Sequence, residues 1–219
     1  MTTGARDDAP PGDIRREAAQ DGTRRQAPAD SVRREAPPDG ICREALPDGV
    51  RRELVGAPHP VLTARALPVD PTDPQVVAAA ADLLASMRRS RCTGLAAPQI
   101  GLGWRLFSID VSRHPGTRSC AGELVVANPR LVAASHWATA REGCLSVPGL
   151  TGDVSRATRV TIQGERPGSG APLIVHADAF EARCIQHQMD HLDGVLFLDR
   201  VTGTRAVYRV VQKGVRQVT

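Results

Sequence analysis

The segment CIQHQMDHLDG, residues 184–194, carries the side chains of this chain that are best suited to chemistry. His187 and His191 stand four positions apart, so on an α-helix both imidazoles lie on one face. This spacing is typical of two ligands to one metal ion, although packed or solvated histidine pairs share it. Metal-dependent hydrolases of this pattern have a glutamate after the first histidine as general base, whereas this chain has Gln188. The segment therefore indicates a metal site that lacks its usual proton carrier.

A third metal ligand is expected from elsewhere in the chain, because two side chains alone hold an ion weakly. Cys144, in REGCLSVPG, is the best candidate, since a thiolate between a glycine and a short apolar run can be presented from a tight turn or a strand. Two histidines and one cysteine leave one of four positions open for water. That arrangement is typical of catalytic metal sites, because structural sites fill all four positions with protein atoms.

The elements that must position these residues can be read from the apolar periodicity. Residues 74–89 have helical spacing, and a second helix is predicted from near Ala179 to a stop at Gly194. Short apolar runs between glycine and proline signals predict strands at 105–111, 124–135, 159–165 and 173–179, and residues 206–215 are predicted to form a short final helix. Together they predict an α+β fold.

Composition excludes several classes of function. The chain has 219 residues and a net charge of +4, but only one of its 28 basic residues is a lysine, which indicates coding bias more than a nucleic-acid surface. Its five cysteines are an odd number, and the first 20 residues hold no apolar run typical of a signal peptide. No stretch reaches the roughly 18 apolar residues of a membrane span. We therefore expect a cytoplasmic protein without membrane or DNA partners.

Residues 14–58 contain a nine-residue repeat: IRREAAQDG, TRRQAPADS, VRREAPPDG, ICREALPDG and VRRELVGAP. Each copy has too few apolar residues to offset the entropy of ordering it. We therefore predict a disordered tail at residues 1–49 and a folded domain at residues 50–219. A stacked solenoid, or duplication of the segment that opens the domain, are the alternatives.

A further segment, TGLAAPQIG at residues 93–101, connects these observations. GLAAPQ, EGCLSVPG and QHxxDHLDG occur in this order and resemble the three motifs of the peptide deformylases, over about Val50 to Val201. The resemblance implies antiparallel strands around a central metal-binding helix. It also implies hydrolysis of the N-formyl group from the first methionine of new polypeptides, with N-formyl-Met nascent peptides at the ribosome as partners and a monomeric enzyme.

The resemblance implies a role for each motif residue. Cys144, His187 and His191 match the ligands of one divalent metal, most often Fe²⁺, with Ni²⁺, Co²⁺ or Zn²⁺ as substitutes. Gln99 matches the glutamine whose amide, together with the backbone N–H of the residue at Leu145, binds the developing oxyanion.

Further candidates lie around these residues. Gly94 suits a close backbone approach to substrate, or is a plain turn glycine. Phe180 and Cys184 share the helix stripe of the two histidines and could line a pocket for the methionine side chain, or simply belong to the core. Glu142 and Asp190 are candidates to accept the second N–H of a ligand histidine, or are ordinary salt-bridge partners.

Gln188 departs from the family, which has glutamate there to move a proton from water to the leaving amine. Glutamine keeps the shape and one hydrogen bond but cannot carry the proton, which typically costs about 10² to 10⁴ in rate, or about 3 to 5 kcal/mol. Three interpretations follow: a deformylase with reduced activity, a non-catalytic binder of formyl-Met peptides or deformylase inhibitors, or a one-nucleotide change from glutamate. The first is our prediction.

Overall fold

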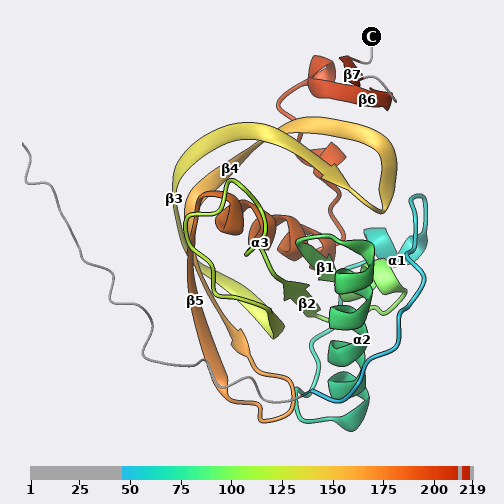
Figure 1. Cartoon of the computed structure of the whole chain (residues 1–219), viewed down its shortest axis with the longest axis vertical. Coiled ribbons are helices and arrows are strands. Elements are labelled where there is room, and N and C mark those ends of the chain that lie inside the picture. The colour runs from blue at the N-terminus through green and yellow to red at the C-terminus, as the bar shows by residue number, and fades with distance from the viewer. Residues whose placement is uncertain (1–45, 212–213, 218–219) are drawn as a thin grey trace, which may run out of the picture. The chain divides into compact units, whose positions relative to one another are not determined.

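The chain folds around one helix, α3 (Ala179–Leu192), which strands of an antiparallel sheet enclose (Figure 1). The computed structural model describes residues 46–211 and 214–217. Its helices are α1 (Pro60–Thr63), α2 (Pro74–Ser90), α3 and the 3-10 turns η1 (Ala97–Ile100), η2 (Phe197–Arg200) and η3 (Thr204–Ala206). Its strands are β1 (Gly94–Ala96), β2 (Leu106–Ile109), β3 (Leu124–Cys144), β4 (Val147–Glu165), β5 (Pro172–Asp178), β6 (Val207–Val211) and β7 (Gly214–Gln217).

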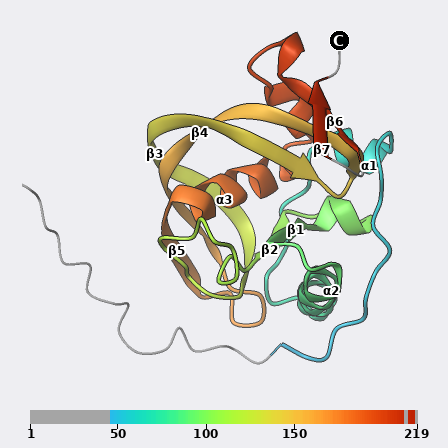
Figure 2. The same cartoon turned by 45° about the horizontal axis from the view of Figure 1, so that its top comes forward.

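The sheet is built on one long hairpin. Its strand order is β1-β2-β3-β4-β6-β7, with β5 also paired to β4, and every pairing is antiparallel. β3 and β4 are joined by a tight turn at Leu145 and Ser146, since Cys144 pairs with Val147. Register shifts near Ala127 and Leu131 are bulges, which let a strand bend. Figure 2 shows the hairpin arching over α3, so the α+β fold with strands around this helix is confirmed.

Two apolar clusters fix the helices against the sheet. Ala182, Ile185 and Leu192 of α3 pack with sheet residues such as Phe107 and Val160. α2 covers β1 and β2 in a second cluster that includes Leu83, Met87, Leu95 and Leu106. Complete burial of side chains of this size stabilises the fold by about 1.5 to 3 kcal/mol each. The helix that carries both motif histidines is therefore held rigidly.

The two long helices lie where the sequence predicts them. α2 begins at Pro74, after Asp73, whose carboxylate accepts a hydrogen bond from the backbone N–H of Gln75. α3 begins at Ala179, and Gly194 follows it with φ 73°. A Cβ at Gly194 would lie 2.6 Å from the carbonyl oxygen of Thr63, so glycine satisfies both the left-handed backbone and the close contact.

The predicted final helix at residues 206–215 is wrong. The chain there forms β6, which pairs with β4 and then with β7. Three of the five residues of β6 are valines, whose branched side chains favour strands, and β7 begins with a glycine. Pairing with β4 at residues 150–152 supplies backbone partners that a short exposed helix would lack.

The predictions for the repeat tail fall largely outside the described residues, which begin at Leu46. Leu46 itself is partly buried against the cluster that contains α2. Among the described helices, none is both long and apolar enough to cross a membrane.

Candidate metal centre

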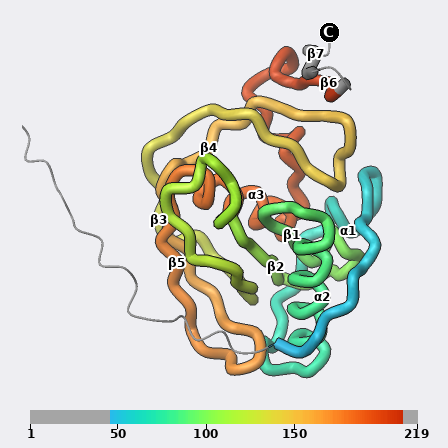
Figure 3. The backbone as a smooth tube through the Cα atoms, viewed as in Figure 1, coloured from blue at the N-terminus to red at the C-terminus, as the bar shows by residue number. Residues whose placement is uncertain are grey.

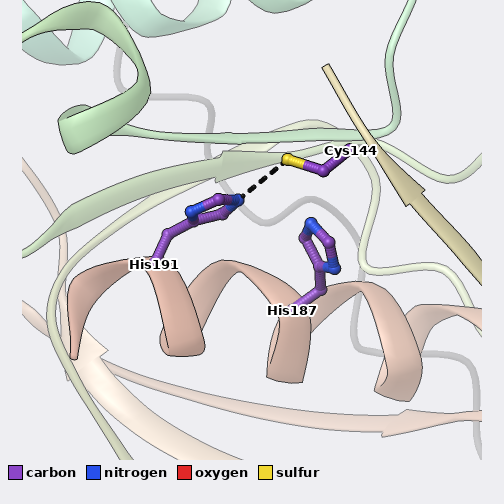
Figure 4. A group of neighbouring side chains, drawn as sticks. All are labelled: Cys144, His187 and His191. Atoms are coloured by element: carbon purple, nitrogen blue, oxygen red, sulfur yellow. Dashed lines mark hydrogen bonds between the residues drawn. The ribbon is translucent and has the colours of Figure 1, made fainter. Parts of the chain in front are cut away.

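Three side chains from distant parts of the chain converge between the β3–β4 turn and α3 (Figure 4). The ligating atoms of Cys144, His187 and His191 all lie within 4.8 Å of one another. The Sγ atom of Cys144 is 3.2 Å from Nε2 of His191. In the part of the chain that the structure describes, this is the one group of three or more potential ligands close enough to hold a metal ion.

The secondary structure explains why these side chains meet. His187 and His191 are one turn apart on α3, with ring centroids 5.0 Å apart and planes at 77°. Cys144 is the last residue of β3, directly before the two-residue turn, and a register shift between Gly143 and Cys144 ends the regular ladder there. The strand end thus presents a thiol above the helix face that carries both imidazoles.

The charges of these groups suit a divalent metal. Burial raises the pKa of the Cys144 thiol, but interactions with His187 and His191 outweigh burial and lower this pKa to about 5. The residue is therefore a thiolate at neutral pH, which is the form that binds metals. Burial lowers the pKa of His187, but Cys144 and Glu142 outweigh it and raise this pKa to about 9. A metal ion would displace that proton, and ligand distances of about 2.0 to 2.3 Å fit this spacing.

A buried network of ion pairs contacts His187. Glu142 Oε2 is 3.0 Å from Nδ1 of His187, so Nε2 of that ring is left for a metal. Arg156 donates to both oxygens of Glu142, at 2.7 and 2.9 Å, and to Asp190 at 2.6 Å. Burial raises the pKa of Glu142, but His187 and Arg156 outweigh it and bring this pKa to about 2. Glu142 is thus a fixed carboxylate that orients a histidine.

Of the two interpretations that the sequence left open for Asp190, the observed contacts favour the salt-bridge partner. Its carboxylate accepts hydrogen bonds from Arg156 and Arg200, whereas Nδ1 of His191 is buried without a hydrogen-bond partner in the described residues. The reason is geometric, because Asp190 precedes His191 on α3 and projects about 100° away from it. Asp190 anchors the network through Arg156 instead of orienting a ligand.

Gln99 is held with its amide nitrogen facing the cysteine. The side chain is 3% exposed, and its Oε1 accepts a hydrogen bond from the backbone N–H of Ala96 at 3.0 Å. Its Nε2 donates to Oγ of Ser146 at 3.2 Å and lies 3.5 Å from Sγ of Cys144. Leu145, between Cys144 and Ser146, is 46% exposed at the turn. Both proposed oxyanion donors therefore adjoin the thiolate.

Gln188 and Gly94 face each other across the contact between α3 and β1. Gln188 is 4% exposed, and its Oε1 is buried without a hydrogen-bond partner in the described residues. A Cβ at Gly94 would lie 2.9 Å from both Nε2 of Gln188 and Sγ of Cys184. Gly94 lies in a strand instead of a turn, and a larger residue there would require the side chains of Cys184 and Gln188 to shift.

Phe180 and Cys184 lie further along the same side of α3. The Phe180 ring stacks on the imidazole of His114, with centroids 3.4 Å apart and planes at 8°. Sγ of Cys184 is 3.4 Å from the carbonyl oxygen of Thr93, just before β1. Burial raises the pKa of the Cys184 thiol to about 12, so it stays protonated. The sequence did not identify three further residues that contact the site, because their partners are remote in the chain. They are His114, which stacks on Phe180, Ser146, which binds Gln99, and Arg156, which binds Glu142 and Asp190.

Glu142→Gln is expected to weaken metal binding by about tenfold, because a neutral amide oxygen accepts the His187 N–H less strongly than a carboxylate does. The measurement is the metal dissociation constant from competition with a chromogenic chelator. Asp153→Asn makes the same chemical change on the surface, where Asp153 binds Arg141 and Tyr208, and should leave affinity unchanged. Equal affinities for wild type and Glu142→Gln would show that this contact does not support the metal.

Comparison with known proteins gives a consistent result. The family model for polypeptide deformylases matches residues 51–206. A peptide deformylase of Desulforudis audaxviator is 40% identical over 152 residues, which cover 68% of this chain and 93% of that protein. One from a Synechococcus strain is 43% identical over 143 residues, 65% of this chain and 69% of that protein.

Solved structures agree. The peptide deformylase of Thermotoga maritima superimposes with a TM-score of 0.64 and 30% identity, covering 70% of this chain and 99% of that one. That of Legionella pneumophila gives 0.63 and 33%, over 70% and 87%. A Met-Ala-Ser-bound enzyme from Acinetobacter baumannii gives 0.64 and 28%, over 69% and 99%.

Proposed function

This chain belongs to the polypeptide deformylase family, and from that premise we propose that it is a metal-dependent hydrolase slowed by the amide at Gln188. The reaction is removal of the N-formyl group from the N-terminal methionine of newly made polypeptides. The observation that carries the proposal is the intact set of Cys144, His187 and His191, with ligating atoms within 4.8 Å of one another. Release of formate from a formyl-Met peptide by the metal-loaded chain is its test.

Cys144, His187 and His191 would hold one divalent ion, which we propose to be Fe²⁺, with Ni²⁺, Co²⁺ or Zn²⁺ as alternatives. When bound, such an ion polarises the formyl carbonyl and makes a water molecule a stronger nucleophile at neutral pH. Glu142 fixes the ring of His187 through Nδ1 and keeps Nε2 directed to the site. Because Arg156 neutralises Glu142 and is itself buried, this orientation does not depend on solvent.

Gln99 and Leu145 act on the oxygen of the formyl group. The Gln99 amide already has its oxygen bound by Ala96, so its nitrogen is directed toward Ser146 and Cys144. The backbone N–H of Leu145 is the second donor that we assign. Donors fixed before the reaction stabilise the negative charge that develops on this oxygen, without reorganisation of the site.

Gln188 occupies the position from which a carboxylate would move the proton. Its Oε1, which has no hydrogen-bond partner among the residues that the structure describes, can accept a hydrogen bond from a water molecule or from a substrate N–H. An amide cannot take up that proton and deliver it to the leaving amine, so breakdown of the tetrahedral state relies on solvent. We therefore propose a rate about 10² to 10⁴ below that of a chain with glutamate at this position.

One alternative has support from the same residue. A site with intact ligands and oxyanion donors but no proton carrier can bind a formyl-Met peptide, or an inhibitor of deformylases, without cleaving it. Formate release distinguishes this binder from a slow enzyme. We further propose a monomer that meets nascent chains at the ribosome in the cytoplasm, with neither DNA nor membrane as a partner.

Gln99→Ala is expected to lower kcat/KM by about 10², because it removes one oxyanion donor. The assay is best made in a Gln188→Glu background, where the rate is predicted to be high enough to follow a loss of this size. Gln75→Ala removes an exposed glutamine of α2 and should have no effect. A loss of less than threefold for Gln99→Ala would remove this residue from the reaction.

A further inference from the structure

An extended segment at the start of the described chain runs along α2 toward α1 (Figure 3). We name residues 49–57 the strap. The N–H of Val50 donates to Asp82 Oδ1 at 2.7 Å, and the guanidinium of Arg52 donates to Asp82 Oδ2 at 2.7 Å. The N–H of Arg52 donates to Ser86 Oγ at 2.9 Å. Asp82 and Ser86 are polar residues buried on α2, at 5% and 0% exposure, so α2 carries a built site for this segment.

The second half of the strap binds the residues around the metal centre. The N–H of Val55 donates to the carbonyl of Gln99 at 2.9 Å, and that of Ala57 donates to the carbonyl of Ser146 at 2.8 Å. At the other end, a Cβ on Gly49 would lie 2.0 Å from the carbonyl oxygen of Ala81. Backbone atoms cannot move aside as a flexible side chain can, so only glycine fits there.

These contacts define what a segment needs in order to bind. It needs glycine at its first position, arginine at its fourth, and free backbone N–H groups at its seventh and ninth. The strap itself is Gly49 followed by the first eight residues of the last copy of the nine-residue repeat. The four upstream copies can therefore be tested against the same requirements by their sequence alone.

One upstream copy meets every requirement. Residues 40–48 have Gly40 at the first position, Arg43 at the fourth, and Leu46 and Asp48, both with N–H groups, at the seventh and ninth. Proline, which has no N–H, stands at the seventh position of the next two copies upstream, at residues 37 and 28. The first copy is preceded by Asp13 in place of glycine.

We propose that the α2 surface around Asp82 and Ser86 is a peptide-binding site with a second occupant from the same chain, residues 40–48, which bind in place of the strap. Residues 49–58 would then form a loop before His59. Residues 56–58 are exposed, so few contacts hold them to the surface. The entropic cost of closing a loop also rises only slowly with its length.

The strap remains the preferred occupant. Leu54 is partly buried against the α2 cluster, and residues 40–48 offer Ala45 at that position, so less apolar surface would be buried. The second occupant therefore becomes dominant when the strap is blocked. A substitution that blocks the strap is therefore expected to lower the stability of the domain only slightly while residues 40–48 can still bind.

The test is a double-mutant cycle in the full chain, because substitutions at two interacting sites change the stability by amounts that do not add. Gly49→Val blocks the strap at the Ala81 carbonyl, and Gly40→Val blocks the upstream copy at the same point. Gly40→Val alone should leave Tm within about 1 °C. Gly49→Val should lower Tm by a few degrees, and the double variant by about 5 °C or more beyond that, a shift readily resolved for a domain of this size.

Gly22→Val combined with Gly49→Val is the matched control, because that upstream glycine precedes a copy with proline at residue 28. This pair should match Gly49→Val alone. Limited digestion with trypsin gives a second readout. Cleavage after Arg52 relative to Arg43 should rise by about tenfold or more in Gly49→Val, because the protected arginine changes.

The proposal would be overturned by failure of Gly49→Val to fold in the full chain. It would also be overturned by equal Tm for Gly49→Val and its combination with Gly40→Val, or by an unchanged ratio of the two tryptic cleavages. Equal losses from Gly22→Val and Gly40→Val in the Gly49→Val background would also contradict it, because the effect would then not depend on the copy.

Discussion

Gln188→Glu is expected to raise kcat/KM for formyl-Met-Ala-Ser by about 10² or more. The substitution replaces the amide nitrogen of the buried Gln188 side chain with an oxygen. The existing oxygen, Oε1, has no hydrogen-bond partner among the described residues. The neighbouring thiol of Cys184 stays protonated, since burial raises its pKa to about 12, and it donates to the carbonyl oxygen of Thr93. A glutamate at position 188 would therefore not face a second negative charge on Cys184.

The comparison requires equal metal content, so the metal bound per chain is measured in the same samples. Gln75→Glu adds the same charge at an exposed position of α2 and should leave the rate unchanged. An increase below about tenfold at equal metal content would mean that Gln188 does not limit the reaction. In that case other parts of the site have also lost the geometry needed for turnover.

Cys144→Ala is expected to lower bound metal from about one equivalent per chain to below about 0.1, with loss of deformylation to the level of the buffer. The variant removes the only anionic ligand of the set, whose pKa of about 5 makes it a thiolate at neutral pH. Two imidazoles cannot replace the charge or the third bond. Metal is measured by elemental analysis after anaerobic purification and gel filtration.

Cys120→Ala is the matched control, because Cys120 is a free, exposed cysteine. It should retain full metal content and full activity. Complete metal retention by Cys144→Ala would remove this cysteine from the ligand set. Retention of metal with loss of activity would instead make Cys144 a group that acts on the substrate.

The helices and the ligand set could be predicted from sequence because their signals are local. α3 carries its histidines at a fixed spacing and ends at a glycine, so the sequence alone indicates one face and one stop. Cys144 could be added only through the resemblance of three motifs, since nothing local relates it to α3. Iron likewise came only from the resemblance, because a set of imidazole and thiolate ligands ordinarily favours zinc.

Long-range pairing explains what the sequence did not predict. Arg156 stands in an alternating strand sequence, where an arginine is usually exposed, yet it is 4% exposed because Glu142 and Asp190 surround it. The segment 206–215 was wrongly predicted as a helix because its pairing with β4 is 55 or more positions away along the chain. Both features depend on partners that periodicity cannot identify.

The most direct test of the central claim, that this chain is a working deformylase slowed by Gln188, is formate release by the unmodified, metal-loaded chain. With saturating formyl-Met-Ala-Ser, the predicted rate is at least about tenfold above that of Cys144→Ala and about 10² or more below that of Gln188→Glu. Formate release no faster than that of Cys144→Ala, with peptide bound, would contradict the claim and leave a binding protein. A rate equal to that of Gln188→Glu would contradict the role assigned to the missing carboxylate.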